Sequence, residues 1–239
     1  MIDIHCHILP LVDDGSSSVE MSLDMLDQAY RHGTREIVLT PHLAYAYHFE
    51  NPHDKIKDLY DDFKMIVRDA GIPIKMHLGC EFLYSSRKTF DEHFNDITTL
   101  ADTNYLLMEF FFDASADDIL SAVKSVLERG CIPVVAHPER FEAIQTDLDV
   151  AFEIKRMGGY LQMNKGSILG DYGALARETV LQLLNEGLID FVGSDAHNLR
   201  TRYPAMDESY DTVRHYFGDE CARVIFEENP KKLLSGGKV

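Results

Sequence analysis

The sequence predicts an α/β barrel, because short apolar runs alternate along it with segments of helical periodicity. Seven runs have the length and composition of strands that are buried on both faces of a parallel sheet. They are residues 1–5, 36–40, 74–83, 105–110, 132–137, 160–164 and 189–195. The length of 239 residues lies within the range of α/β barrels that form one domain, so a single domain over residues 1–239 is expected.

The segments between these runs carry helix start and stop signals. Ser17 and Glu20 have the spacing of a capping box in front of an apolar helical face, and Gly33 is placed to end that helix. Similar patterns predict helices over residues 54–70, 116–129, 147–157, 173–186 and 207–217. The final residues, KKLLSGGKV, are expected to be frayed. An open doubly wound sheet is the competing architecture, but neither GxGxxG nor GxxxxGK[ST] is present to support nucleotide binding.

Composition narrows the class of protein. A hydrophobic content of 45% and a charged content of 26% are those of a globular protein with enough apolar material for a core. A formal net charge of −17 disfavours nonspecific binding of nucleic acid, because a polyanion is repelled. Without a membrane-spanning run or a secretory signal pattern, a cytoplasmic protein with no membrane insertion is expected. The four cysteines form no CxxC pair, which favours reduced thiols over disulfides.

Chemistry-bearing side chains fall at the C-terminal ends of the strand-like runs, and these ends meet at one rim of a parallel barrel. The potential metal ligands there are His5, His7, Asp14, His42, Glu81, Glu109, His137, Asp195 and His197. In HCH, alternation along a strand turns His5 and His7 to the same side, while Cys6 faces away. Only the run at 160–164 supplies no ligand; it ends at Asn164.

The types of ligand indicate which metals would bind. Imidazole nitrogen and carboxylate oxygen without thiolate suit manganese, iron or zinc better than copper. One ion takes about four to six ligands, so this set predicts two or three divalent ions with at least one bridging carboxylate. Glu109 lies between YLLM and FFF, where burying a carboxylate without a cation would be costly. A lone histidine at a strand end is more often structural, so the prediction depends on nearly every strand contributing.

Taken in order, these motifs resemble the polymerase and histidinol phosphatase (PHP) superfamily. The likeness is carried by HCH, TPH, the glutamate after the third strand, the glutamate in LLMEF, AHPER and GSDAH. More narrowly, HCHILPLVDDG, AHPER and SDAHN resemble the bacterial manganese-dependent protein-tyrosine phosphatases encoded with capsule and exopolysaccharide genes, from residue 1 to about residue 230. The resemblance implies a distorted seven-stranded (β/α)7 barrel of the PHP type with a trinuclear metal site.

The resemblance also implies how the ligands divide among the ions. One ion would be held by His5, His7, Glu81 and Asp195, a second by Glu81, Glu109 and His137, and a third by Asp14, His42 and His197. Glu81 would be the bridge. Manganese is the metal implied first, with iron or zinc as alternatives. The segment LAYAYHFEN after TPH lacks the basic residues that many relatives carry there, so the substrate is expected to approach differently on that side.

The expected reaction is hydrolysis of a phosphomonoester by metal-activated hydroxide, without a covalent phosphoenzyme. Arg140 and Arg202 are candidates for holding the nonbridging phosphoryl oxygens, with Arg200 as a rival to Arg202. A tyrosyl leaving group suits such a site, because its pKa of about 10 lessens the need for a strong general acid. By family likeness, the protein substrate would be the phosphotyrosine tail of a kinase of polysaccharide synthesis or export.

Further residues are candidates for contacts with the substrate. Tyr45, Tyr47 and Phe49 follow His42 and could form an aromatic wall around the phosphotyrosine ring. Three residues of the segment MNKGS are candidates for lining the same pocket: Asn164, Lys165 and Ser167.

Four other functions fit parts of the sequence. A small-metabolite phosphatase such as a histidinol-phosphatase is the strongest alternative. Phosphodiester cleavage, as in polymerase-linked PHP domains, is disfavoured by the acidic charge and by the absence of a polymerase. A noncatalytic binding module is disfavoured because four clustered carboxylates without ions would repel one another. A cysteine-dependent phosphatase needs five residues between its cysteine and arginine, whereas six separate Cys80 from Arg87.

Overall fold

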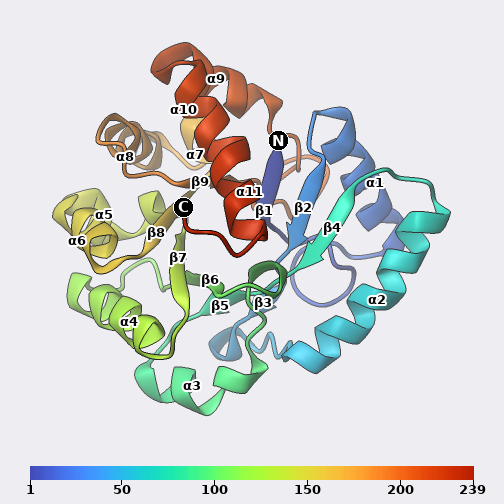
Figure 1. The fold of residues 1–239 in the computed structure, drawn as a ribbon, viewed down its shortest axis with the longest axis horizontal. Coiled ribbons are helices and arrows are strands. Elements are labelled where there is room, and N and C mark those ends of the chain that lie inside the picture. Colours follow the sequence, from blue (N-terminus) through green and yellow to red (C-terminus); the bar gives the residue numbers. More distant parts are fainter.

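In the computed structural model, which describes residues 1–239, parallel strands curl around the centre of the molecule and helices cover their outer side (Figure 1). The strands are β1 (Ile2–Cys6), β2 (Glu36–Leu39), β3 (His42–Leu43), β4 (Lys75–Leu78), β5 (Glu81–Leu83), β6 (Tyr105–Glu109), β7 (Ile132–Ala136), β8 (Tyr160–Asn164) and β9 (Phe191–Gly193). One sheet has the order β1-β2-β4, and the other has the order β3-β5-β6-β7-β8-β9. Every strand pair is parallel, so the predicted α/β class is confirmed.

The nine strands of the structure differ from the seven that the sequence predicts. The predicted strand 36–40 corresponds to β2, which ends at Leu39. A separate strand, β3, begins after Pro41, which has no backbone N–H to donate to a neighbouring strand. The predicted strand 74–83 is divided into β4 and β5 at Gly79, where a Cβ atom would lie 2.7 Å from Leu100 Cδ2. These interruptions divide the strands into two sheets.

Backbone hydrogen bonds join β1 to the segment that follows β9. Asp195 N donates to His5 O at 2.8 Å, and His7 N donates to Ala196 O at 2.9 Å. Cys6 and Ala196 form an isolated parallel bridge. The first and last strands therefore lie side by side, and the residues at their carboxyl ends are held together.

The longer helices are those predicted from the sequence: α1 (Val19–Arg31), α2 (His53–Asp69), α4 (Ala116–Glu128), α6 (Asp149–Met157), α8 (Ala174–Asn185) and α9 (Asp207–Phe217). The sequence analysis missed α3 (Arg87–Glu92), α5 (Glu142–Thr146), α7 (Lys165–Leu169), α10 (Asp219–Arg223), a π-helical turn (Val224–Glu228) and α11 (Asn229–Leu234). α3, α5 and α7 have five or six residues, too few to show helical periodicity. α10, the π-helical turn and α11 follow one another without a break, and the π-helical turn interrupts the 3.6-residue period of this helix. None of the helices combines the length and apolar character needed to cross a bilayer.

The cap of α1 lies one residue later than predicted. Ser18, not Ser17, is the N-cap, and its hydroxyl accepts a hydrogen bond from Met21 N at 3.1 Å. The predicted capping box with Glu20 is therefore wrong by one position. Gly33 follows the end of the helix with a φ of 93°, which glycine adopts without steric strain.

Apolar side chains form two clusters, one on each side of the strands. A cluster of 48 buried residues lies mainly between the strands and the helices. The smaller one, here called the floor cluster, consists of Ile2, Ile4, Val38, Leu100, Tyr105, Leu107, Val134, Ala136, Phe191 and Leu233. It fills the inside of the ring of strands toward their amino-terminal ends.

The C-terminal segment covers the floor cluster, so the predicted fraying of KKLLSGGKV is wrong. Leu233 of α11 is fully buried in that cluster. Tyr105 Oη donates to Gly237 O at 2.9 Å, and Tyr160 Oη donates to Val239 O at 2.9 Å. In Figure 1, α11 and the C-terminus lie over the middle of the ring of strands.

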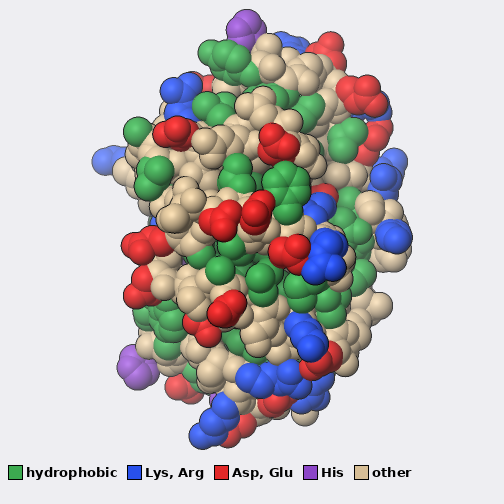
Figure 2. All heavy atoms as spheres, turned by 90° about the vertical axis from the view of Figure 1, so that its left-hand side faces the viewer, with side chains coloured by type: hydrophobic (Ala, Val, Ile, Leu, Met, Phe, Trp, Pro, Cys, Tyr) green, Lys and Arg blue, Asp and Glu red, His purple; other side chains and the backbone are tan.

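The outer surface carries charges of both signs. Figure 2 shows one face, on which acidic and basic side chains are interspersed with apolar ones. The excess of acidic over basic residues, 40 against 23, is thus not accompanied by a separation of the two signs on this face.

Candidate metal centre

A β-bulge in β1 aims the first histidine into the ring of strands. The register with β2 shifts between Asp3 and Cys6, so Ile4 and His5 both turn inward, Ile4 to the floor cluster and His5 to Glu81. Asp3 Oδ1 accepts hydrogen bonds from His5 N at 3.2 Å and from Ser194 N at 3.0 Å. This buried carboxylate therefore fixes the backbone on both sides of the junction between β1 and β9.

His5, His7, Glu81 and Asp195 form the first group of potential ligands, with one atom from each lying within 4.8 Å of the others. Glu81 Oε2 lies 3.1 Å from His5 Nε2 and 3.2 Å from His7 Nε2. Asp195 Oδ1 lies 3.6 Å from each of the same two nitrogens. All four residues are buried, and they are the set that the sequence analysis assigned to one ion.

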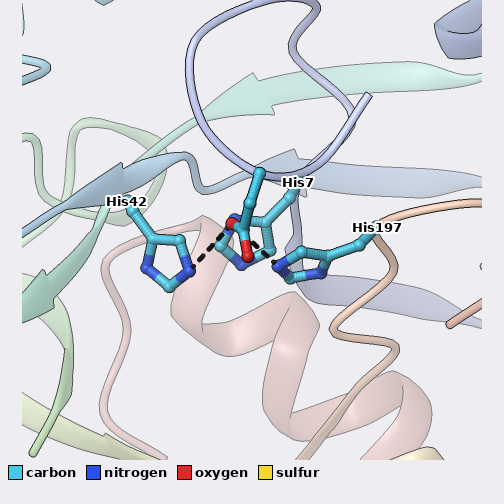
Figure 3. Close-up of side chains that lie close together, drawn as sticks. His7, His42 and His197 are labelled. Carbon is cyan, nitrogen blue, oxygen red and sulfur yellow. Dashed lines mark ion pairs between the residues drawn. The ribbon is translucent and has the colours of Figure 1, made fainter. Parts of the chain in front are cut away.

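A second group is formed by His7, Asp14, His42 and His197. Asp14 Oδ1 lies 3.6 Å from His42 Nε2 and 3.4 Å from His197 Nε2. Figure 3 shows the imidazoles of His7, His42 and His197 converging on one carboxylate. The predicted third set contained Asp14, His42 and His197 without His7, which the geometry brings to the same place.

The third group is His42, Glu81 and Glu109. His42 Nδ1 lies 3.2 Å from Glu81 Oε2 and 3.1 Å from Glu109 Oε1. His137, which the sequence analysis named for this set, also reaches both acids: its Nε2 lies 2.9 Å from Glu81 Oε1 and 3.7 Å from Glu109 Oε2. Glu81 thus contacts His5 and His7 of the first group as well as both of these histidines, so it occupies the middle of the constellation.

Three orienting residues escaped the sequence analysis or were given another role. Asp13 Oδ2 accepts hydrogen bonds from His7 Nδ1 at 2.8 Å and His42 N at 2.9 Å, although only its neighbour Asp14 was predicted to act. Gln162 Oε1 lies 2.7 Å from His5 Nδ1, and Asn164 Nδ2 donates to Asp195 Oδ2 at 2.6 Å. The one predicted strand without a ligand, residues 160–164 (β8), therefore supplies side chains that orient the ligands of other strands.

Local backbone geometry explains why two positions of the motifs are glycine, and it places two other residues of the motifs at positive φ. A Cβ atom on Gly15 of DDG would lie 2.2 Å from His7 O, and one on Gly193 of GSDAH would lie 2.6 Å from His5 Cβ. His137 and Asp195 have positive φ values of 35° and 50°, which L residues seldom adopt. Such strain is typical of residues whose side chains must point at a functional site.

The charges of the constellation call for a cation. Burial lowers the pKa of His5, but the carboxylates of Glu81 and Asp195 outweigh burial and raise this pKa to about 9. In the same way, Glu81 and Glu109 outweigh burial and raise the pKa of His42 to about 10. Burial opposes ionisation of Glu81, but His5 and His42 hold the pKa of this carboxyl well below its usual range. Buried carboxylates this close together require positive charge, supplied either by protons on the histidines or by metal ions.

Several buried ligand atoms have no hydrogen-bond partner: His42 Nδ1, Glu109 Oε1 and His197 Nε2. The first two lie 3.1 Å apart, yet in an orientation that makes no hydrogen bond. In contrast, burial and His7 lower the pKa of His197 to about 4, which leaves its imidazole neutral and able to donate a lone pair. Nitrogen and oxygen donors with unused lone pairs fit divalent manganese, iron or zinc, so the residues suit the metals that the sequence predicts.

A cavity of about 550 Å³ opens above these ligands. Its ionisable lining is Asp14, His42, His48, Glu81, Glu109, His137, Asp195, Arg140 and Arg202, and its aromatic lining is Tyr47, Phe49, Phe110 and Phe112. A groove of about 610 Å³ between α2 and β4 is slightly larger, but none of the three groups of potential ligands lies there. The chemistry therefore points to the smaller cavity as the candidate site.

Two arginines stand beside Asp195 in this cavity. Arg202 Nη2 donates to Asp195 Oδ1 at 2.5 Å, and Arg140 Nη1 lies 3.7 Å from Asp195 Oδ2. The guanidinium of Arg140 lies 4.5 Å from the ring centre of Phe112 and 4.7 Å from that of Tyr172, so it is held between two aromatic faces. Arg200, the rival to Arg202, is exposed and is not part of the lining.

The predicted aromatic wall is present only in part. Tyr47 and Phe49 line the cavity, whereas Tyr45 stacks on His93 with ring centres 3.7 Å apart and donates to Asp96 at 2.6 Å. Phe112, which the sequence analysis did not consider, lines the cavity instead.

The predicted lining by the segment MNKGS is wrong, since none of its three candidates borders the cavity. Asn164 acts from behind Asp195, and Ser167 Oγ donates to Glu139 Oε1 at 2.5 Å. Lys165 is buried with its ammonium 3.1 Å from the ring centre of Tyr203.

Comparisons with known proteins show similarity over almost the whole chain to a family of capsular polysaccharide synthesis. The family described as "Capsular polysaccharide synthesis, CpsB/CapC" matches residues 1–235. The tyrosine-protein phosphatase CpsB of Streptococcus agalactiae serotype V is 37% identical over 243 residues, covering 98% of each chain. The tyrosine-protein phosphatase YwqE of Bacillus subtilis is 32% identical over 234 residues, covering 98% of this chain and 91% of YwqE.

Solved structures extend the likeness to three dimensions. A chain from the crystal structures of YwqE from Bacillus subtilis and CpsB from Streptococcus pneumoniae, described as metal-dependent tyrosine phosphatases, superposes with a TM-score of 0.92 at 32% identity. The match covers 100% of this chain and 96% of the other. A phosphotriesterase homology protein from Escherichia coli shares only the fold, with a TM-score of 0.54, 13% identity and 97% of each chain covered.

Proposed function

The chain belongs to the capsular polysaccharide synthesis CpsB/CapC family, and we propose that it is a metal-dependent protein-tyrosine phosphatase. The observation that carries the proposal is the position of Glu81. Its two oxygens contact histidines from three different strand ends, and two arginines stand at the mouth of the same cavity. Such a site combines a place for clustered cations with groups that recognise a phosphate.

We propose that three ions bind, with the ligand sets inferred from the motifs. Because His7 Nδ1 donates to Asp13, His7 has one lone pair, on Nε2, and would serve the first ion only. His42 would serve the ion beside Asp14 and His197 through Nε2, because a neutral imidazole has one lone pair to donate. His137 would then complete the set of Glu81 and Glu109. Manganese is proposed first, with iron or zinc as alternatives that the same donors suit. When bound, such ions neutralise charge on phosphoryl oxygens and lower the pKa of nearby water.

The residues of the chain have distinct roles in this proposal. Arg140 and Arg202 would bind the nonbridging oxygens, since a planar guanidinium matches two phosphate oxygens at once. Asp195 holds Arg202 at 2.5 Å and so fixes the direction from which its guanidinium acts. Asp13 and Gln162 orient His7 and His5 through their Nδ1 atoms, which keeps each Nε2 directed at the carboxylates. A phenolate needs little protonation to leave, so no separate general acid is proposed.

The finer points of the proposal concern fold type, partner and location. We propose a single PHP-type domain over residues 1–239, with β2 and β3 counted as one strand of a seven-stranded barrel and β4 and β5 as another. The proposed substrate is a phosphotyrosine protein, the tail of a tyrosine kinase of polysaccharide synthesis or export. A cytoplasmic location is supported by four cysteines that are all free thiols.

Metal analysis combined with hydrolysis of a phosphotyrosine peptide tests this function. The purified protein should contain two or three divalent ions per chain, lose its activity on chelation and regain it when Mn²⁺ is restored. Undiminished activity in the metal-free protein would contradict the proposal. A histidinol phosphate assay run in parallel tests the alternative function. A higher kcat/KM for that metabolite than for the peptide would identify a small-molecule phosphatase.

A further inference from the structure

We propose that Phe112 is the residue that makes this site specific for aryl phosphates, by stacking on the ring of the phosphorylated tyrosine. The inference rests on the proposed phosphatase function and adds to it the side chain that reads the leaving group. Phe112 lies in the loop after β6, three residues beyond the candidate ligand Glu109. It lines the cavity while 46% of its surface is exposed.

The carboxylates lie deep in the cavity, and the exposed aromatic rings lie near its opening. Glu81 and Asp195 are 1% exposed and Glu109 is 8% exposed, whereas Phe112 and Tyr47 are 46% and 53% exposed. A phosphoryl group that reaches the buried carboxylates therefore carries its ester group past the exposed rings. In phosphotyrosine that ester group is a flat phenyl ring, which gains from contact with an aromatic face, whereas the short alkyl group of phosphoserine does not.

The three phenylalanines of the segment FFF have different surroundings. Phe110 is 3% exposed and packs among Tyr84 and Phe141. Phe111 meets Tyr47 edge-on with ring centres 5.8 Å apart. Of the three, only Phe112 both borders the cavity and leaves nearly half of its surface to solvent, so its ring has surface available to a ligand.

One face of Phe112 is already in use. The guanidinium of Arg140 lies 4.5 Å from its ring centre, and the ring of His137 meets it at 6.3 Å in an edge-on arrangement. Phe112 therefore connects an arginine proposed for the phosphate with a histidine proposed for a metal. Its remaining exposed surface is placed to meet a ring whose phosphate Arg140 holds.

A matched pair of ligands separates the ring from the phosphate. Phenylphosphonate and methylphosphonate carry the same anionic group, and calorimetry measures their binding to the manganese-loaded protein without any turnover. In Phe112→Leu, which keeps an apolar side chain, affinity for phenylphosphonate should fall about fivefold, as expected for the loss of one aromatic contact. Affinity for methylphosphonate should change by less than about twofold, since its anionic contacts remain.

Control variants make the outcome decisive. Phe152→Ala removes a ring that is 41% exposed on α6, outside the cavity, and should leave both affinities unchanged. Phe112→Tyr, which keeps the ring, should preserve the preference for phenylphosphonate. Equal losses for both ligands in Phe112→Leu would mean that the residue acts only through Arg140, and this would overturn the proposal.

Failure of the ring contact and failure of the phosphatase function can be told apart. If the parent protein prefers phenylphosphonate through Phe112 but hydrolyses no phosphotyrosine peptide, the ring site stands and the enzymatic function falls. If it hydrolyses the peptide while Phe112→Leu leaves the ratio of the two affinities unchanged, the function stands and the inference about Phe112 falls.

Discussion

The two ends of the same strands differ in almost every physical property. At the carboxyl ends, buried charges gather, the backbone is bulged in β1, and His137 and Asp195 adopt positive φ values. At the amino ends, the floor cluster contains only apolar side chains and one tyrosine, and the C-terminal segment covers it. The change occurs within one or two residues, as from Ile4 to His5 in β1 and from Ala136 to His137 after β7.

This difference indicates how the molecule sustains a site that is unfavourable by itself. Burying a carboxylate costs several kcal/mol even when it is paired, about as much as burying two or three large apolar side chains contributes. The floor cluster lies on the same strands as the ligands, so its packing holds the strand ends in position before any ion binds. The comparison predicts that mutations at the two ends affect different measurements.

The largest expected effect comes from removing the central carboxylate. Glu81→Gln keeps the shape of the side chain but loses the charge that contacts His5, His42 and His137. The value of kcat/KM for a phosphotyrosine peptide should fall by about 10³ or more, because a metal supplies several kcal/mol of charge stabilisation. Fewer ions should be retained, as measured by elemental analysis.

The control for this variant is Glu142→Gln, which removes an exposed acid at the start of α5. It should leave both activity and metal content unchanged. If Glu81→Gln kept its full complement of ions and its rate, the rim would not be organised around Glu81.

The second-largest effect is expected from a mutation in the floor cluster, at the amino ends of the strands. Phe191 of β9 is fully buried in the floor cluster, so Phe191→Ala should lower the free energy of unfolding by about 3 to 5 kcal/mol through lost burial and a new cavity. Denaturant unfolding measures the loss. At a temperature where the variant is still folded, its kcat and metal content should match the parent's, and a large fall in kcat per folded molecule would contradict the separation of the two ends.

The comparison also explains what could be predicted from the sequence. The main strands and the longer helices follow from apolar periodicity, and the candidate ligands follow from their position at strand ends, because both signals are local. Asp13 was missed because two adjacent acids look alike in sequence. Only the structure shows that Asp13 faces His7 Nδ1, whereas Asp14 points between His42 and His197.

Other misses depend on contacts between distant residues. The position of Tyr45 soon after His42 predicts that it lines the cavity, but His93 and Asp96, about fifty positions away, hold it elsewhere. The C-terminal segment is polar and glycine-rich in sequence, yet it covers the floor cluster because the hydroxyls of Tyr105 and Tyr160 donate hydrogen bonds to its backbone. No local pattern contains this information, since each contact joins residues far apart in the chain.

A third prediction tests the orienting contacts at the rim. Asp13→Asn should weaken Mn²⁺ binding by about 10- to 100-fold, because losing a hydrogen-bonded partner of a ligating histidine has that effect in metal sites. Titration calorimetry gives the affinity, and Asp62→Asn, a change at an exposed acid on α2, is the matched control. An unchanged affinity in Asp13→Asn would mean that His7 is oriented by packing alone.

The smallest effect should come from the cover of the floor. Tyr105 Oη donates to Gly237 O at 2.9 Å and accepts from Val239 N at 3.4 Å, and Tyr105→Phe removes both hydrogen bonds while keeping the ring in the floor cluster. The free energy of unfolding should fall by about 1 to 2 kcal/mol, the usual net contribution of two hydrogen bonds, with no change in Mn²⁺ affinity. Because the ring stays, a loss as large as that of Phe191→Ala would show that the C-terminal segment detaches as a unit, and that the floor needs its cover as much as its own packing.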